Sequence, residues 1–395
     1  MTKMDVIIRN GRVFTVDDSR PWAESVGVIG DRIAFVGTDK EAAGFVGPDT
    51  KVIDAGGRLV LPGLIDAHTH CLYGHQIYFW ANLTPADSLE ELIRTVEMHA
   101  LEHPEHHLVG GRGYRYSAVM VEGRLPGRAV LDRVISDRPV WLKSYDGWTA
   151  CTNTRFLDIA RKRLGKAFDR LPGVERDSVT GEPTGVFFKT DELEPLVEEL
   201  STAGTDLMYD GLKLVIEEMV RWGITSVHEA GAGDMKDLQI YERLRRNEEL
   251  KARVYVAMQY APARGEEQMG DFERMRSEFS DEWIKVGAVK LFIDGVEDSH
   301  TAAMLEPYDD LPGETGETIY PPEEFKQIVE RLDRMGLQCI THACGDRGVR
   351  TALDAYEHAA LRNGPRDRRH RSEHAEIVSP EDVPRFKELG VGPSM

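Results

Sequence analysis

The sequence predicts an α/β fold of the (β/α)8 TIM-barrel type, incomplete at the C-terminus, with a small N-terminal β-sandwich portion and a large insertion. Two observations support this fold class. From about residue 210 onward, short apolar strands alternate with amphipathic helices, which is typical of a parallel sheet covered by helices. Polar residues also end these apolar runs, and barrel enzymes carry their catalytic groups at the C-terminal ends of the strands.

Residues 1–60 are predicted to form the β-sandwich portion. Five short apolar segments are separated by turn residues such as Asn10-Gly11 and Gly30-Asp31. The predicted strands cover residues 5–8, 12–16, 25–29, 32–36 and 51–54. We expect them to form a small antiparallel β unit that continues into the barrel without a linker.

Residues 61–395 are predicted to form the barrel, and residues 61–70 contain its first strand. Later strands are predicted at residues 223–229, 252–258, 286–294, 337–342 and 369–374. Helices are predicted at residues 209–221, 235–248, 323–335 and 348–360. Residues 390–395 resemble the beginning of a seventh strand.

Residues 72–208 interrupt this alternation. The segment is mixed in character, contains many prolines and glycines, and is too long for one strand–helix connection. We therefore expect an insertion after the first barrel strand that covers the mouth of the active site and the substrate.

Two histidines close the first predicted strand, in the motif LPGLIDAHTH at residues 61–70. His68 and His70 are two residues apart, so their side chains point to the same face of a strand and can hold one metal ion. In an isolated motif they could also be polar residues at a strand exit. Four further residues end later strands and favour the metal site: His228, Lys290, His342 and His374.

Lys290 needs a separate explanation, because an ammonium group has no lone pair for a metal and repels a cation. If burial lowers its pKa, CO2 could convert the amine into a carbamate, which is an anionic oxygen ligand. The alternative is that Lys290 pairs with Asp294 or with a substrate carboxylate. The chemistry of the residue alone leaves both open.

Five motifs resemble the amidohydrolase superfamily, specifically its YtcJ-like branch. They are LPGLIDAHTH (61–70), TSVHEAG (225–231), VKLFIDG (289–295), THACGDR (341–347) and SEHAEIVSP (372–380). The resemblance covers nearly the whole chain, and the order and spacing of the motifs make it specific. It implies a distorted barrel flanked by a β-sandwich that both chain termini build.

The resemblance also implies a set of site residues. The implied metal ligands are His68, His70, His342 and His374, with Lys290 bridging if two ions bind. The expected ion is divalent, zinc in the first place, and it activates a water molecule that attacks an amide or related carbonyl. His228 is a candidate for holding the carbonyl or the tetrahedral intermediate. Asp294 and Asp346 are candidates for substrate contact or for orienting a neighbouring group, with loop capping as the alternative.

The sequence departs from the family pattern in two places. Trp148 stands where related proteins often carry the histidine of an Asp-Gly-His motif, which predicts a more hydrophobic or aromatic substrate. The alternative is that Trp148 packs inside the insertion. The family's aspartate on an eighth strand, which binds metal and shuttles protons, has no counterpart before Met395. We expect the chain to be a fragment of a longer hydrolase, and the alternative is a protein without a competent base.

These observations predict a metal-dependent hydrolase that cleaves a non-peptide C–N bond in a small-molecule substrate: an N-substituted amide, a formamide or a cyclic amide. Cleavage of an ester or carbamate and a non-catalytic regulatory binding protein are the alternatives. With 49 basic and 68 acidic residues the net charge is −19, which disfavours nucleic acid as a partner.

The compartment and the assembly follow from weaker signals. No apolar run of membrane-spanning length is present, and four scattered cysteines do not resemble a disulfide framework: Cys71, Cys151, Cys339 and Cys344. A cytoplasmic protein is expected, without membrane association, and a homo-oligomer is compatible with the sequence.

Overall fold

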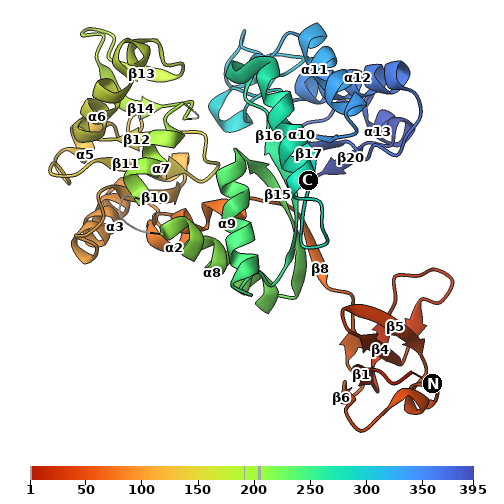
Figure 1. The fold of residues 1–395 in the computed structure, drawn as a ribbon. Helices are drawn as coiled ribbons and strands as arrows, with labels where there is room; N and C mark the ends of the chain where they lie inside the picture. The colour runs from red at the N-terminus through yellow and green to blue at the C-terminus, as the bar shows by residue number, and fades with distance from the viewer. Residues whose placement is uncertain (1, 191, 203–205) are drawn as a thin grey trace. The chain divides into compact units, whose positions relative to one another are not determined.

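The computed structural model describes residues 2–190, 192–202 and 206–395. The chain divides into two compact units (Figure 1). One comprises Met1–Ile65 together with Gly223–Thr225, and the other comprises Asp66–Trp222 and Ser226–Met395. The sequence placed the boundary after residue 60, whereas the units separate five residues later, inside the first barrel strand.

The first unit contains two small sheets. Its strands are β1 (Val6–Arg9), β2 (Arg12–Phe14), β3 (Trp22–Ala23), β4 (Ser25–Ile29), β5 (Arg32–Gly37), β6 (Lys51–Asp54) and β7 (Leu59–Val60). The strand orders are β5-β4-β1-β6 and β3-β2-β7. A capping box between Thr38 and Glu41 begins the short helix α1 (Asp39–Ala42). Met4, Ile7 and Ala42 form the core of this unit.

The expectation of a purely antiparallel unit is wrong at two pairings. β1 pairs with β6 in parallel, and β2 pairs with β7 in parallel. Between β5 and β6 the chain crosses over through α1 and the short 3-10 helix η1 (Ala43–Phe45), which returns it in the direction of β1. Alternating hydrophobicity shows which segments are strands, but it does not specify the direction of their partners.

The second unit contains a seven-stranded sheet in the order β20-β19-β18-β17-β16-β15-β8, which is the chain order reversed. Its strands are β8 (Leu64–Thr69), β15 (Ile224–Ala232), β16 (Arg253–Gln259), β17 (Ile284–Phe292), β18 (Gln338–Ala343), β19 (Arg371–His374) and β20 (Gly392–Ser394). The pairs from β15 to β20 are all parallel. The predicted barrel class is therefore confirmed, including a seventh strand near the end of the chain.

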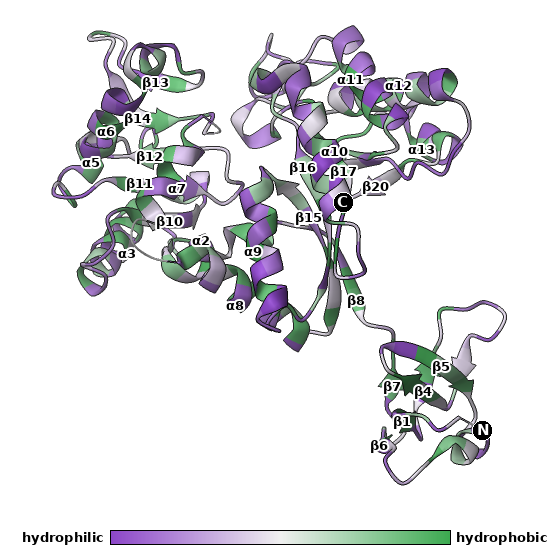
Figure 2. Ribbon diagram, viewed as in Figure 1, coloured by the Kyte–Doolittle hydropathy of each residue, from purple (hydrophilic) through white to green (hydrophobic). Residues whose placement is uncertain are grey.

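Helices follow the barrel strands in alternation: α8 (Leu207–Arg221), α9 (Met235–Arg246), α10 (Gln268–Glu278), α11 (Pro322–Arg334), α12 (Asp346–Asn363) and α13 (Val383–Leu389). Short 3-10 helices are η2 (Cys71–Tyr73), η4 (Pro262–Glu267) and η5 (Glu297–Ser299). α9 buries Leu238, Tyr241 and Leu244, while its other face is hydrophilic (Figure 2). α10 and the short α13 lie outside the predicted helices, and the apolar residues of α10 are interrupted by Gly270 and by charges.

The insertion forms its own lobe around a six-stranded sheet in the order β13-β14-β12-β11-β10-β9. The strands are β9 (Ala81–Asn82), β10 (Val109–Tyr114), β11 (Val140–Ser144), β12 (Ala150–Thr152), β13 (Val174–Arg176) and β14 (Pro183–Phe187). Its helices are α2 (Gly74–Phe79), α3 (Leu89–Glu102), α4 (Tyr116–Val119), α5 (Arg128–Leu131), α6 (Thr154–Leu164), η3 (Gly165–Arg170) and α7 (Glu194–Thr202).

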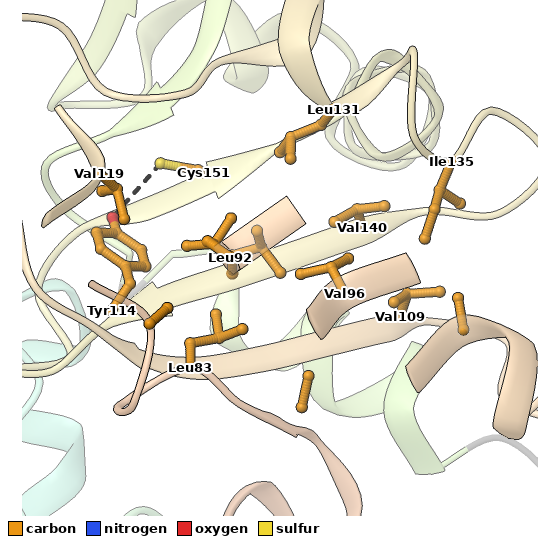
Figure 3. Close-up of a cluster of buried hydrophobic side chains, with 14 of the residues drawn as sticks. Leu83, Leu92, Val96, Val109, Tyr114, Val119, Leu131, Ile135, Val140 and Cys151 are labelled. Atoms are coloured by element: carbon orange, nitrogen blue, oxygen red, sulfur yellow. Dashed lines mark hydrogen bonds between the residues drawn. The ribbon is translucent and has the colours of Figure 1, made fainter. Parts of the chain in front are cut away.

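Two hydrophobic clusters hold this lobe together. In one of them Leu92 and Val96 of α3 pack near Val109 of β10, and the Tyr114 hydroxyl lies 3.4 Å from the Cys151 Sγ (Figure 3). The other contains Trp141, whose ring centroid is 4.7 Å from that of Phe156. The insertion thus has cores of its own. Among the described residues, no helix combines the length and apolarity needed to cross a bilayer.

A fully buried carboxylate fixes the loops at the C-terminal edge of the barrel. Asp294 accepts backbone hydrogen bonds from Ala303 and Gly345 on Oδ2, at 3.0 and 2.9 Å, and from Cys344 on Oδ1, at 3.0 Å. It therefore ties the loop after β17 to the start of α12. A Cβ atom at Gly348 would lie 2.3 Å from Asp294 Oδ2, so this approach requires glycine.

We predict that Gly348→Ala lowers the free energy of unfolding by about 1–3 kcal/mol, because the added methyl group overlaps the Asp294 carboxylate. Chemical denaturation followed by circular dichroism measures the change. Gly270→Ala is the matched control: it lies in α10, and no described atom is within 4 Å of its added Cβ. Gly270→Ala should leave the free energy of unfolding unchanged or raise it by up to about 1 kcal/mol. Equal destabilisation of the two variants would contradict the prediction.

Candidate active site

Four imidazole rings form a continuous row at the C-terminal edge of the barrel. The ring centroid of His68 lies 5.3 Å from that of His70 and 5.2 Å from that of His374, and His374 is 4.6 Å from His342. The rings come from β8, the residue after it, β18 and β19. The structure therefore brings together the four histidines that the sequence predicted as ligands.

Buried carboxylates face the Nδ1 atoms of the first two histidines. His68 Nδ1 donates a hydrogen bond to Glu373 Oε2 at 2.5 Å, which leaves Nε2 as the acceptor nitrogen. His70 Nδ1 is buried, lacks a hydrogen-bond partner among the described residues and lies 3.9 Å from Glu229 Oε1. A carboxylate behind a histidine is the usual support of a metal ligand. The donor chemistry of these residues therefore suits a metal ion.

Burial keeps these imidazoles neutral. It lowers the pKa of His70 to about 3 and that of His374 to about 4, and the positive charge of Lys290 adds to both effects. The pKa of His342 is lowered well below its usual value for the same reasons. All three rings are therefore unprotonated at neutral pH, which is the form that binds a metal.

Lys290 lies on β17 within electrostatic range of these histidines and is 1% exposed. Burial lowers the pKa of its amine to about 8, although the charge of Glu373 opposes the shift. A fraction of the amine is therefore neutral near pH 7, and this form reacts with CO2. The buried and partly neutral amine of Lys290 meets the condition for carbamate formation. Carboxylation of Lys290 stays a prediction.

The backbone is strained where β19 presents its histidine. His374 has a φ of 72° and Ala375 a φ of 46°, so two consecutive residues with side chains occupy the left-handed region. A hydrogen bond from Ala375 N to Ala343 O, at 3.0 Å, holds this turn against β18. Such strain is maintained where the surrounding structure fixes the conformation, and it concentrates at functional sites.

A cavity of about 830 Å³ opens beside the histidine row. Barrel residues His70, Lys290, His342 and His374 line one part of it, and the insertion supplies another part that includes Trp148. The Trp148 ring centroid lies 5.4 Å from that of His342 and 6.0 Å from that of Phe292. Trp148 therefore lies in the cavity, beside a predicted ligand.

His68 reaches the cavity only through its neighbours in the row, and three further predicted residues also do not line it. His228 lies in the middle of β15 rather than at its end, with its ring 4.8 Å from that of Tyr255. Both Asp294 oxygens accept backbone hydrogen bonds, as the loop-capping alternative expects. Asp346 accepts a hydrogen bond from Leu305 N at 2.7 Å, at the start of α12. Their catalytic and substrate roles stay predictions.

The supporting carboxylates, Glu229 and Glu373, are not among the residues predicted from the sequence. Glu229 follows His228 and Glu373 precedes His374 in the motifs, so alternation along each strand was the available signal. Burial raises the pKa of Glu229 to about 7, and hydrogen bonds from Tyr241 and from the backbone of Leu72 oppose the shift. Burial also raises the pKa of Glu373, but the hydrogen bond from His68 and the charge of Arg371 outweigh it and hold the pKa at about 2.

Two carboxyl groups and a thiol form a cluster beside the histidine row. The ligand atoms of Glu297, Cys344 and Glu376 lie within 4.8 Å of one another, and the Cys344 Sγ is 3.4 Å from His342 Nε2. Burial and the neighbouring Glu376 carboxylate raise the pKa of Glu297 to about 7. Glu376 lines the cavity, so this pair of carboxyl groups can retain a proton close to it.

The chain matches one protein family along most of its length. The profile of a family described as "Amidohydrolase family" matches residues 51–395. The chain is 29% identical over 400 residues to the protein LONG AFTER FAR-RED 3 of Arabidopsis thaliana, covering 98% of this chain and 67% of that protein.

A bacterial relative and a solved structure extend the comparison. The chain is 28% identical over 415 residues to an N-substituted formamide deformylase of Arthrobacter pascens, covering 99% and 72% of the two chains. The structure of an uncharacterized metal-dependent hydrolase from Pyrococcus furiosus superposes with a TM-score of 0.69 at 25% identity. The superposition covers 98% of this chain and 76% of that one.

We predict that Glu373→Gln weakens zinc binding about 10–100-fold, because it removes the negative charge that holds and polarises His68. Competition with a chelating zinc indicator at pH 7 measures the affinity. Glu330→Gln is the control, since Glu330 also accepts from a histidine, His358 at 2.9 Å, but does not line the cavity. Unchanged zinc affinity of a folded Glu373→Gln protein would show that Glu373 does not support a ligand.

Proposed function

This chain belongs to the amidohydrolase family, and from that premise we propose that it hydrolyses a non-peptide C–N bond in a small molecule, with zinc as the divalent ion. The proposed substrates are N-substituted amides, formamides and cyclic amides. The observation that carries the proposal is the row of four imidazoles, three of which line a cavity of about 830 Å³ together with Lys290.

The metal would be held by His68, His70, His342 and His374, with Lys290 as a further ligand in its carbamate form. When bound, it supplies a Lewis acid that polarises a carbonyl group and lowers the pKa of water. In this structure His342 Nε2 lies 2.9 Å from the Gly295 carbonyl oxygen, to which it can donate. Nδ1 is then the nitrogen of His342 that is available for a metal.

The remaining residues act on the substrate and on protons. Trp148, Phe187 and Phe292 give the cavity aromatic walls that exclude water around the reacting carbonyl and favour an apolar leaving group. The Glu297–Glu376 pair retains a proton near neutral pH, close enough to the cavity to protonate a departing amine. The Arthrobacter relative, named for deformylation of N-substituted formamides, supports an amide as the bond that is cleaved.

We predict that the zinc-loaded protein hydrolyses formanilide, that chelation abolishes the activity and that added zinc restores it. His342→Ala should lose metal and lower the turnover about 100-fold or more, because a bound metal contributes several kcal/mol to this chemistry. Aniline release and metal analysis by mass spectrometry measure the two effects. His358→Ala, which changes a histidine that does not line the cavity, should retain both.

The alternatives give different results in the same assay. A protein that binds zinc but hydrolyses neither formanilide, acetanilide nor a lactam would favour the non-catalytic binding protein. Turnover of 4-nitrophenyl acetate without turnover of any amide would move the proposal to esters. Amide hydrolysis that persists in the fully metal-free protein would contradict the metal-dependent mechanism.

We also predict that Trp148→His shifts the preference toward more polar substrates. The change replaces an aromatic wall by a hydrogen-bonding ring, so kcat/KM for formanilide relative to N-methylformamide should fall about 10-fold. Trp283→His is the control, since Trp283 is 46% exposed and does not line the cavity. An unchanged ratio in the Trp148 variant would assign this residue to packing alone.

A further inference from the structure

We propose that Arg112 forms a carboxylate-binding subsite, so that the substrate carries a carboxylate on the same molecule as the scissile amide. The inference rests on the proposed function and narrows it to anionic amides. Arg112 belongs to the insertion, whereas the histidine row belongs to the barrel, yet Arg112 and three histidines of the row, His70, His342 and His374, line the same cavity.

The backbone of Arg112 is held on both sides. Arg112 lies on β10, where it pairs with Asn82 of β9 and Lys143 of β11. Its carbonyl oxygen also accepts a hydrogen bond from Leu83 N at 2.8 Å. Strand pairing therefore sets the point from which its guanidinium group enters the cavity.

The guanidinium group has no counter-ion in the part of the chain that the structure describes. Neighbouring Lys143 pairs with Glu194 Oε1 at 2.6 Å, but no ion pair or side-chain hydrogen bond involves Arg112. Arg112 is only partly exposed, and burial lowers its pKa, while Tyr73 and Glu194 oppose the shift. A charge removed from water without a partner is unfavourable. An anionic ligand would provide that partner through two parallel N–H···O hydrogen bonds.

The neighbouring ion pair leaves the charge of Arg112 uncompensated. Lys143 pairs with Glu194, so these two residues together carry no net charge. A ligand carboxylate carries the negative charge that would pair with the Arg112 guanidinium group.

The position of Arg112 suits recognition of the substrate that is hydrolysed. Its charge contributes to the lowered pKa of His70, so the guanidinium lies within electrostatic range of the histidine row. Aromatic residues, including Trp148, line the same cavity. One aryl amide can therefore place its amide at the row and its carboxylate at Arg112.

The test compares 4-formamidobenzoate with formanilide as substrates of the zinc-loaded protein. In Arg112→Gln, kcat/KM for the carboxylated amide relative to the neutral one should fall about 30-fold or more, since a buried charge pair is lost. Arg115→Gln is the matched control, because Arg115 pairs with Asp87 and does not line the cavity. An unchanged ratio in Arg112→Gln overturns the subsite. Arg112→Lys, which keeps the charge without the two-pronged geometry, should give an intermediate ratio and serves if the Gln variant does not fold.

Ligand binding tests the Arg112 subsite without requiring that the protein hydrolyses an amide. If neither amide is hydrolysed, the proposed function fails, and calorimetric titration with benzoate and benzamide still tests the subsite. Benzoate should bind at least about 10-fold more weakly to Arg112→Gln than to Arg115→Gln, while the two variants should bind benzamide alike. If His342→Ala removes benzoate binding and Arg112→Gln does not, the carboxylate binds the metal, and the subsite is overturned.

Discussion

The contact between β8 and β19 is the constraint on which the candidate site depends. In the sheet order β8 stands at one end and β19 is next to the other end. Even so, His68 donates to Glu373 at 2.5 Å, and the Arg371 guanidinium donates to the Ala67 carbonyl at 2.9 Å. Only a sheet that curls into a barrel can make these contacts. Arg371 Nε also donates a hydrogen bond to Glu373, at 2.7 Å. Because Glu373 accepts from both Arg371 and His68, its carboxylate can remain ionised inside the protein.

Desolvation then sets the chemistry of the groups around this ion pair. It lowers the pKa of His70, His374 and Lys290, and it raises that of Glu229. In each case it favours the neutral form, which is an electron-pair donor for the imidazoles and the amine. Glu373 is the exception, because the hydrogen bond from His68 and the positive charge of Arg371 lower its pKa by more than burial raises it. A set of neutral donors around one ionised carboxylate is well suited to a divalent cation.

The barrel and the insertion contribute different parts of the cavity. The barrel supplies the donors and part of the aromatic wall, including Phe292, and the insertion supplies Trp148, Arg112 and the Lys143–Glu194 pair. Asp146 fixes the loop of Trp148 by accepting hydrogen bonds from its backbone N–H and from Ser144 Oγ. The hydrophobic clusters inside the insertion keep these groups in place. The groups that would hold a metal and several of the groups that would contact a substrate therefore lie on different parts of the chain.

The sequence by itself determined the barrel class, the strands β8 and β15 to β20, and the four histidines that meet at the ends of β8, β18 and β19, because periodicity and polar strand exits are local properties. Only the tertiary structure decided the parallel pairings of β6 and β7, the helix α10, the place of His228 inside β15 and the three backbone partners of Asp294. It also decided that Arg112, 178 residues before Lys290, lines the same cavity. These features depend on which distant segments pack together and on how much water each side chain loses. The spacing of residues along one segment specifies neither the packing of distant segments nor the loss of water at each side chain.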